Sequence, residues 1–309
     1  MKSLRTCAVL ALASSLIPLS LMAQERPPII DMHLHTHHPG DIPGGVPALC
    51  RPEPCRGQGA ATATADESIR ATLGQMRRYN IVKAFLSGPD PEELRRWVTA
   101  APGRFIPGLF MLKPGQPGPD VLRREFEAGR LAGMGEIATQ LTGVAPNDPA
   151  LEPYFALAAE RNIPVLIHTE GIGPYLPGFR SAAGNPLLLE DVLVRHPDLR
   201  IYVENSGYPF LGEMIAMMYQ YPQLYGDVST ITWVIPRSAF YAYLRGMMDA
   251  GLGKRVMFGT DQMRWPEAIG WAVQAIEEAP FLSEEQKRDI FYRNAVRFLE
   301  TGGQGAKGR

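Results

Sequence analysis

Four of the six histidines in this chain lie within six residues, at His33, His35, His37 and His38. A short apolar run, Pro-Pro-Ile-Ile, leads directly into them, and this pattern is typical of a buried strand with imidazoles at its C-terminal end. Residues two apart on a strand point to the same side, about 6–7 Å from one another. Because imidazole is the commonest metal-ligating side chain near neutral pH, His33 and His35 predict half of a metal site.

Other apolar runs of the chain also end in polar side chains of ligand type. These are Glu136, His168, Asn205, Asp227 and Asp261. Together with the paired histidines they make a nitrogen and oxygen donor set typical of zinc or a similar divalent ion. Three or four protein ligands with one open position describe a catalytic site rather than a structural one.

Each of these residues also has an ordinary structural interpretation. His168 alone would more often be a hydrogen-bonded core histidine, Asp261 alone could cap a helix, and Glu136 alone could pair with an arginine. We interpret Asp227 as a supporting group or a cap. His196 ends a helix and is expected at the surface. The set is stronger than its members because ligands come from four strand ends.

Strand-like and helix-like stretches alternate along the whole chain and would position these side chains. Strands are predicted at 29–35, 81–86, 105–111, 133–137, 164–168, 201–205, 224–228 and 255–261, and helices at 66–79, 91–101, 120–131, 149–162, 185–195, 210–219, 238–250, 266–278 and 283–299. Eight such units predict a single-domain α/β fold, a (β/α)8 barrel, in which chemistry gathers at the C-terminal ends of the strands. The alternative is an open doubly wound sheet. No Gly-rich phosphate loop follows the first strand, which disfavours its dinucleotide-binding form.

The N-terminal residues have the pattern of an export signal. Lys2 and Arg5 precede an apolar stretch of residues 7–22 that ends at Ala23, so we expect a signal peptide at 1–23, a barrel domain at 24–301 and a secreted or periplasmic protein. A membrane anchor is the alternative, but the stretch is short of the roughly 20 residues that span a bilayer. The Gly-rich residues 302–309 are expected to form a disordered tail.

Composition and cysteine usage restrict the class of partner. The net charge is −1 and no long basic or acidic block occurs, which disfavours nucleic acid or stable membrane association and favours a small-molecule substrate. Cys50 and Cys55 would be the two cysteines of the exported chain, and an oxidising compartment favours a disulfide between them over two free thiols. Apolar stretches such as 214–218 could belong to the core or to a homodimer interface.

The motifs and their order along the chain resemble those of the amidohydrolase superfamily, in its amidohydrolase-related (amidohydrolase 2) branch. The matching segments cover nearly the whole chain after the leader and are Asp31-Met-His33-Leu-His35, Gly135-Glu136-Ile137, Ile167-His168-Thr169, Phe258-Gly-Thr-Asp261 and Asn294-Ala-Val-Arg-Phe-Leu299. The resemblance implies a distorted TIM barrel with metal bound by His33, His35, His168 and Asp261. It also implies that Asp261 accepts the proton of the attacking water.

One position departs from the pattern of this family. Its sixth strand usually ends in a histidine, and the matching stretch here, Val-Glu204-Asn205-Ser-Gly207, aligns Asn205 with it. An amide is a weak ligand and no general base. Glu136 could bridge two ions, as an acidic residue on strand four does in related enzymes, but with Asn205 the sequence favours one zinc-like ion. Alternation along a strand would turn Glu204 to the other side from Asn205, whereas a local bulge would change that direction.

The resulting hypothesis is a metal-dependent hydrolase that directs activated water at a lactone, ester or amide carbonyl, with Asp261 as the catalytic base. Expected substrate contacts are Asn205 and the loop residues Tyr175, Arg180, Tyr208, Trp233, Arg264 and Trp265. The two arginines would suit a carboxylate-bearing substrate, although ordinary surface pairing explains them equally well. Two alternatives stay open: a metal-dependent non-oxidative decarboxylase of an aromatic or unsaturated acid, and an exported binding protein in which Asn205 marks a degenerate site.

Overall fold

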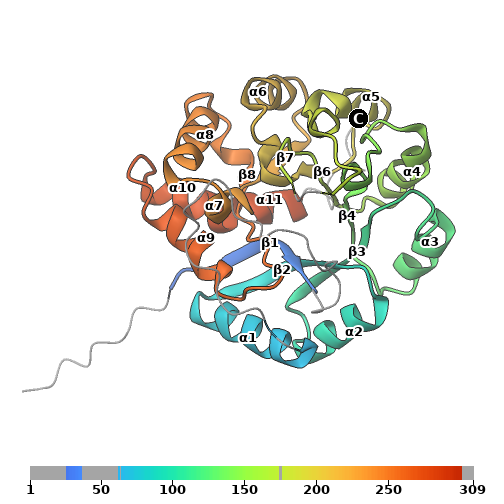
Figure 1. The fold of residues 1–309 in the computed structure, drawn as a ribbon, viewed down its shortest axis with the longest axis horizontal. Helices are drawn as coiled ribbons and strands as arrows, with labels where there is room; N and C mark the ends of the chain where they lie inside the picture. Colours follow the sequence, from blue (N-terminus) through green and yellow to red (C-terminus); the bar gives the residue numbers. More distant parts are fainter. Residues whose placement is uncertain (1–25, 37–61, 63, 174–175, 301–309) are drawn as a thin grey trace, which may run out of the picture.

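Eight parallel strands pair in chain order around one sheet, each followed by helical structure on the outside (Figure 1). The computed structural model describes residues 26–36, 62, 64–173 and 176–300. The strands are β1 (Ile29–His35), β2 (Ile81–Gly88), β3 (Phe105–Met111), β4 (Gly133–Ile137), β5 (Val165–Ile167), β6 (Ile201–Val203), β7 (Leu224–Asp227) and β8 (Val256–Met257). The predicted (β/α)8 barrel is confirmed.

The barrel is brought to near closure by backbone hydrogen bonds between β1 and the segment that continues β8. Met32 N donates to Phe258 O at 2.8 Å, Asp261 N donates to His33 O at 2.7 Å, and His35 N donates to Gln262 O at 3.1 Å. The regular part of β8 is only two residues long. These bonds therefore hold Asp261 directly beside the histidines of β1.

Helices form a ring around the strands. Their bounds are α1 (Ala65–Arg78), α2 (Pro91–Ala100), α3 (Pro119–Glu127), α4 (Glu152–Arg161), α5 (Glu190–Arg195), α6 (Leu211–Gln220), α7 (Ile231–Val234), α8 (Arg237–Asp249), α9 (Ala268–Glu277), α10 (Glu284–Arg288) and α11 (Asn294–Glu300). Local sequence explains several starts, because Thr64, Asp90 and Ser283 each accept a hydrogen bond from a backbone N–H of the first turn. None of the helices in the described residues is both long and apolar enough to span a bilayer.

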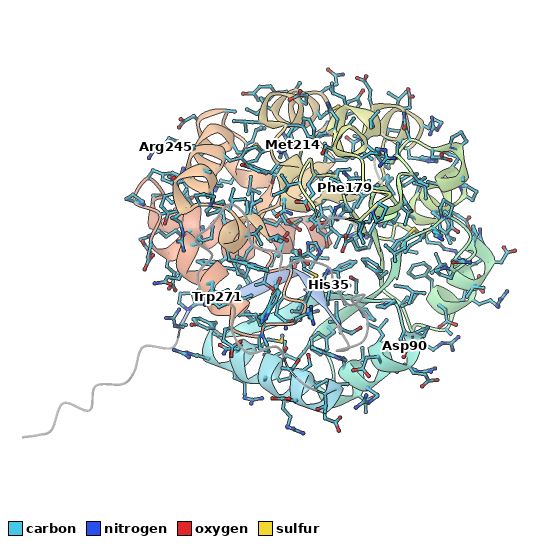
Figure 2. All side chains as sticks on the ribbon, viewed as in Figure 1. His35, Asp90, Phe179, Met214, Arg245 and Trp271 are labelled. Atoms are coloured by element: carbon cyan, nitrogen blue, oxygen red, sulfur yellow. The ribbon has the colours of Figure 1, made fainter. Side chains whose placement is uncertain are left out.

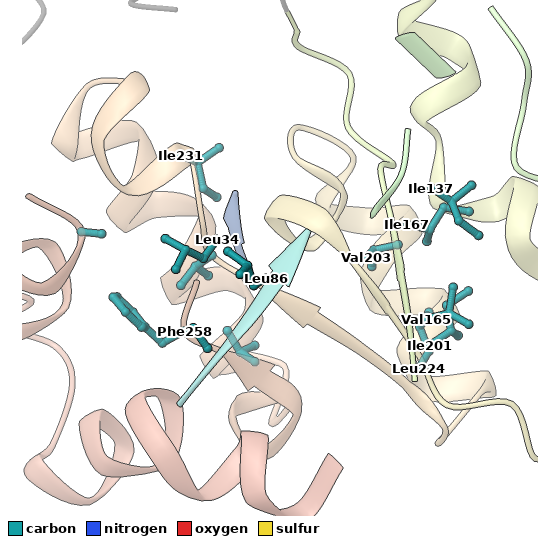
Figure 3. Packing of buried hydrophobic residues seen from close by; sticks show 14 of the residues in the cluster. Leu34, Leu86, Ile137, Val165, Ile167, Ile201, Val203, Leu224, Ile231 and Phe258 are labelled. Atoms are coloured by element: carbon teal, nitrogen blue, oxygen red, sulfur yellow. The ribbon is translucent and has the colours of Figure 1, made fainter. Parts of the chain in front are cut away.

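Two apolar layers hold the fold together. The outer layer lies between the strands and the helices and contains outward-facing strand residues such as Leu34, Ile137 and Val203 (Figure 3). The inner layer fills the base of the barrel, where Tyr202 stacks edge-on against Phe298 of α11 with ring centroids 5.2 Å apart. The base of the barrel is therefore packed, and only its C-terminal mouth is polar.

The last helical segment seals that base. A π-helical turn at Asp289–Arg293 separates α10 from α11, and its Ile290 carbonyl accepts a 2.9 Å hydrogen bond from Phe258 N. Asn294 Nδ2 donates to Val256 O at 2.6 Å. Both bonds satisfy backbone groups next to β8, so the closing motif of the sequence has a structural role.

Register shifts in β1 and β4 turn the polar residues inward. Asp31 and Leu34 of β1 are three residues apart, but their partners on β2, Ala84 and Leu86, are only two residues apart. The extra residue on β1 is the signature of a bulge. Met32 belongs to the inner layer, yet His33 directly after it also reaches the site. On β4 a similar shift lies between Met134 and Ile137 and brings Glu136 to the mouth.

Gly135, inside the β4 shift, requires glycine. Its φ is +119°, and a Cβ there would lie 2.4 Å from Leu166 O. We expect Gly135→Ala to lower the free energy of unfolding by about 3 kcal/mol, because it combines an unfavourable φ with overpacking against backbone. Urea denaturation measures this. Gly103→Ala is the control, since Gly103 has φ +77° and open space around it, and should cost about 1 kcal/mol. An equal loss of unfolding free energy in Gly135→Ala and Gly103→Ala would contradict the steric argument.

Candidate metal centre

Three imidazoles meet at the C-terminal mouth of the barrel. His33 and His35 come from β1 and His168 directly follows β5. The Nε2 atoms of His33 and His35 lie 3.1 Å apart, so the two rings face the same point as their spacing predicted. Figure 2 shows His35 inside the ring of helices. All three side chains are buried.

Glu136 lies between the imidazoles of the two strands. Its Oε2 is 3.2 Å from Nε2 of both His33 and His35, whereas its Oε1 is 2.9 Å from Nδ1 of His168. Asp261 Oδ1 lies 2.9 Å from His35 Nε2 and 3.6 Å from His33 Nε2. The five residues predicted to bind metal are therefore brought together within one cluster.

A sixth ligand-type side chain, Glu204, joins them and was missed. Its Oε2 contacts Nδ1 of His168, so the expectation that Glu204 faces away is wrong. The strand ends at Val203, and Asn205 and Ser206 then adopt left-handed conformations with φ of 50° and 48°. Strand alternation stops there and Glu204 takes the inward place. The run Asn-Ser-Gly, which tolerates such conformations, was the signal available in the sequence.

The side chains of ligand type form three groups that share members. Within each group, the ligand atoms lie within 4.8 Å of one another. The groups are His33, His35 and Glu136; Glu136, His168 and Glu204; and His33, Glu204 and Asp261. Each mixes imidazole nitrogen with carboxylate oxygen, the donor set of a zinc-like ion. Glu136 belongs to the first group and the second through different oxygens.

The hydrogen bonds behind the histidines fit ligation. His33 Nδ1 lies 3.2 Å from Asp227 Oδ2 and 3.1 Å from Ser229 Oγ, and His35 Nδ1 lies 2.9 Å from Ser87 Oγ. Asp227 thus has the supporting place expected of it. Because an ionised carboxylate only accepts hydrogen bonds, a neutral His33 paired with Asp227 would carry its proton on Nδ1 and turn the lone pair of Nε2 toward the cluster. Metal-ligating histidines are usually held in this way.

The charges of the cluster also call for a cation. Burial lowers the pKa of His33, but the carboxylates of Asp261 and Glu204 outweigh it and raise that pKa well above its ordinary value. Burial raises the pKa of Glu204 well above its usual range and that of Glu170 to about 8. In the described part of the chain, none of these carboxylates pairs with Lys or Arg. A bound divalent cation would supply positive charge next to these carboxylates.

One contact supports this reading directly. His168 Nδ1 and Glu204 Oε2 lie within ion-pair distance, yet Glu204 Oε2 is buried without a hydrogen-bond partner. The two atoms touch without the geometry of a mutual hydrogen bond, as expected of two ligands that point at a shared ion.

The predicted substrate residues have varied surroundings. Arg180 is exposed and donates to two carbonyls of its own loop. Tyr208 is half-buried with its ring centroid 5.1 Å from that of Tyr243. Trp265 is buried, and the Arg264 guanidinium lies 5.9 Å from the centroid of its ring. A role of these side chains in substrate binding stays a prediction.

Asn205 and Trp233 are more deeply placed than expected. Asn205 is fully buried within a hydrogen-bond network. Trp233 is buried and donates from Nε1 to Thr260 O at 2.8 Å, in the segment after β8 that carries Asp261. His196 pairs with Glu152 at 2.7 Å near the surface.

Several predictions concern residues outside those that the structure describes. They are the signal peptide at 1–23, the Cys50–Cys55 disulfide, His37 and His38, Tyr175 and the tail at 302–309. Export from the cytoplasm, a homodimer and a small-molecule substrate likewise stay predictions.

A barrel with buried imidazoles and carboxylates at its C-terminal mouth defines a class of metal-dependent TIM-barrel enzymes. Comparison with known families gives the same result, because the amidohydrolase family model (Amidohydro_2) matches residues 30–301. The chain belongs to the amidohydrolase family.

The similar proteins named below are distant from this chain in sequence. Protein fluG of Emericella nidulans is 23% identical over 147 residues, which are 48% of this chain but only 15% of that protein. An uncharacterised TIM-barrel protein from Bordetella bronchiseptica has a TM-score of 0.65 at 18% identity and covers 90% of this chain and 100% of its own.

Solved structures of this fold include both hydrolases and decarboxylases. A putative 2-pyrone-4,6-dicarboxylic acid hydrolase from Pseudomonas putida has a TM-score of 0.61 at 18% identity, over 88% of this chain and 97% of that one. The 5-carboxyvanillate decarboxylase of Sphingomonas paucimobilis has 0.56 at 18% identity, over 88% and 98%. At these identities the likeness establishes the fold alone.

Proposed function

We propose that this protein is a metal-dependent hydrolase that holds two divalent ions, zinc being the first choice, and cleaves a lactone, ester or amide. The observation that carries the proposal is Glu136, whose two oxygens face two different ligand groups. A carboxylate in that position could hold one ion with each oxygen, and paired ions suit hydrolytic displacement. The geometry thus favours two ions over the single ion expected from the sequence.

The residues of the chain would divide the work as follows. The ions would be held by His33, His35, His168, Glu136, Glu204 and Asp261. Bound ions lower the pKa of water and polarise a carbonyl. Asp261 Oδ2 accepts a hydrogen bond from Thr230 Oγ1.

This bond orients the carboxylate of Asp261 and leaves Oδ1, 2.9 Å from His35 Nε2, facing the ligand cluster. Oδ1 is the atom placed to accept the proton of the attacking water and to return it to the leaving group.

Two alternatives are weighed against this proposal. Non-oxidative decarboxylation is the second candidate, because the fold is shared with 5-carboxyvanillate decarboxylase. A degenerate binding protein is disfavoured, since its only sign was Asn205, and Glu204 completes the cluster of ligands instead.

Elemental analysis combined with a substrate panel tests the proposal. We expect about two divalent ions per chain and hydrolysis of a lactone, ester or amide. A chelator should lower Tm by about 10 °C, because bound ions stabilise only the folded state. Carbon dioxide released from an aromatic or unsaturated acid would favour the decarboxylase. Absence of bound metal after supplementation would overturn the metal-dependent mechanism itself.

A further inference from the structure

We propose that Asn205 is a positioning residue. By hydrogen bonds it holds Asp227 behind His33, Glu170 behind His168, and the ligand-type side chain of Glu204. This inference rests on the proposed metal site. In the family pattern Asn205 aligns with a ligand histidine, but its side chain here is fully buried and is hydrogen-bonded to Glu170, Glu204 and Ser229.

Every hydrogen-bonding position of the Asn205 side chain is used. Its Oδ1 accepts from Ser229 Oγ at 3.2 Å and from Ile231 N at 3.1 Å. Its Nδ2 donates to Glu170 Oε2 at 2.5 Å and to Glu204 Oε1 at 3.3 Å. Two donors on one side and two carboxylates on the other determine the orientation of the amide.

One arm of this network leads to His33. The single hydroxyl proton of Ser229 is shared between Asn205 Oδ1 and Asp227 Oδ1, which lie 3.2 Å and 2.7 Å from Oγ. The backbone N–H of Asn205 donates to Asp227 Oδ1 at 2.9 Å, and Asp227 Oδ2 lies 3.2 Å from His33 Nδ1. Asp227 is fully buried and its orientation is set by these donors. Asn205 therefore helps to hold Asp227 against His33 Nδ1, the arrangement in which Nε2 of His33 would face a bound ion.

The other arm leads to His168. Its Nε2 is buried without a hydrogen-bond partner, and the nearest carboxylate oxygen is Glu170 Oε1 at 3.7 Å. If His168 binds an ion through Nδ1, its ring proton lies on Nε2 and needs an acceptor. Glu170, held by Asn205, is the group placed to accept it, as Asp227 does for His33.

Other side chains fit this position poorly. The backbone of Asn205 has φ 50°, which favours Asn, Asp and Gly over other residues. Aspartate would set a third carboxylate against Glu170 and Glu204, and glycine would leave both without their shared donor. The amide is the short side chain that accepts twice and donates twice.

The main experiment measures the metal dissociation constant of the full chain with zinc and a competing chromophoric chelator. Asn205→Ala should weaken zinc binding by about 10–100-fold, the usual effect of removing an outer hydrogen-bond partner. Asn162→Ala is the matched control, because Asn162 also has a left-handed backbone, φ 52°, but lies at the end of α4. It should lose stability with unchanged zinc affinity.

Two further variants show whether Asn205 acts through its partners. Ser229→Ala removes a donor to Asn205 and Asp227 and should weaken zinc binding in the same direction even if Asn205→Ala fails to fold. In a double-mutant cycle, Asn205→Ala and Glu170→Gln should be non-additive in their effects on zinc affinity, since the two side chains share one hydrogen bond.

The outcomes separate the two proposals. Wild-type zinc affinity in both Asn205→Ala and Ser229→Ala would overturn the positioning role, and so would full additivity in the cycle. A wild-type chain that binds no zinc would instead overturn the proposed function.

Discussion

Asp261→Asn is expected to lower kcat by about 10³-fold, within the range that general-base catalysis contributes, while the zinc content stays near that of the wild type. The amide oxygen can keep the place of Oδ1 next to His35, 2.9 Å from its Nε2, but an amide cannot take up a proton at neutral pH. Steady-state hydrolysis, with elemental analysis of the same preparation, measures both quantities.

Asp148→Asn is the matched control for that substitution. Asp148 caps a short helix by accepting from Ala150 N at 2.9 Å, and asparagine caps equally well, so both kcat and zinc content should be unchanged. Wild-type kcat in Asp261→Asn would remove Asp261 from the proton transfer and would leave the metal site untouched.

Glu136→Gln is expected to reduce bound metal from two ions per chain to one or none. Glutamine offers one oxygen and an NH₂ group, which donates hydrogen bonds and does not ligate, so the two ligand groups can no longer share it. Loss of this charge from a buried site rich in imidazole should also lower kcat by at least as much as Asp261→Asn. Mass-spectrometric metal analysis at defined free zinc gives the stoichiometry.

Glu160→Gln controls for the change of glutamate to glutamine. Glu160 pairs with Arg123 at the surface, where an ion pair contributes little, and two ions should remain. Glu204→Gln should resemble Glu136→Gln in direction, because Glu204 also belongs to two ligand groups. Two tightly held ions in Glu136→Gln would show that this carboxylate does not bridge.

The fold followed from patterns that are local in the chain. Apolar stretches alternating with helical ones predicted all eight strands, and Ser283 starts a helix as its capping pattern indicated. Most of the errors lie at the strand ends, since β5, β6 and β8 are shorter than predicted. In addition, the short helix α7 (Ile231–Val234) was not predicted. Strand ends depend on how each chain segment meets its neighbours, which a single sequence does not display.

Some residues of the site were predicted correctly and others were not, because strand alternation holds only as far as the strand continues. His33 and His35 could be paired because a strand repeats every two residues, and both face the cluster. The same rule applied to Glu204 was wrong, because the chain leaves the strand at Val203 and turns through two left-handed residues. Asn205 was predicted to contact substrate or, as an alternative, to mark a degenerate site. Its hydrogen bonds instead join it to Glu170, Asp227 and Ser229, which lie far from it in the sequence.

The sequence by itself determined the barrel, the strand that carries the paired histidines and the chemical type of the ligands, since periodicity and residue type are local properties. Only the tertiary structure decided that Glu204 faces the cluster, that Glu136 lies between two groups of ligands, and that Asn205 supports them from behind. Those placements depend on bulges and left-handed turns, and these arise where packing against other segments overrides the simple alternation of a strand.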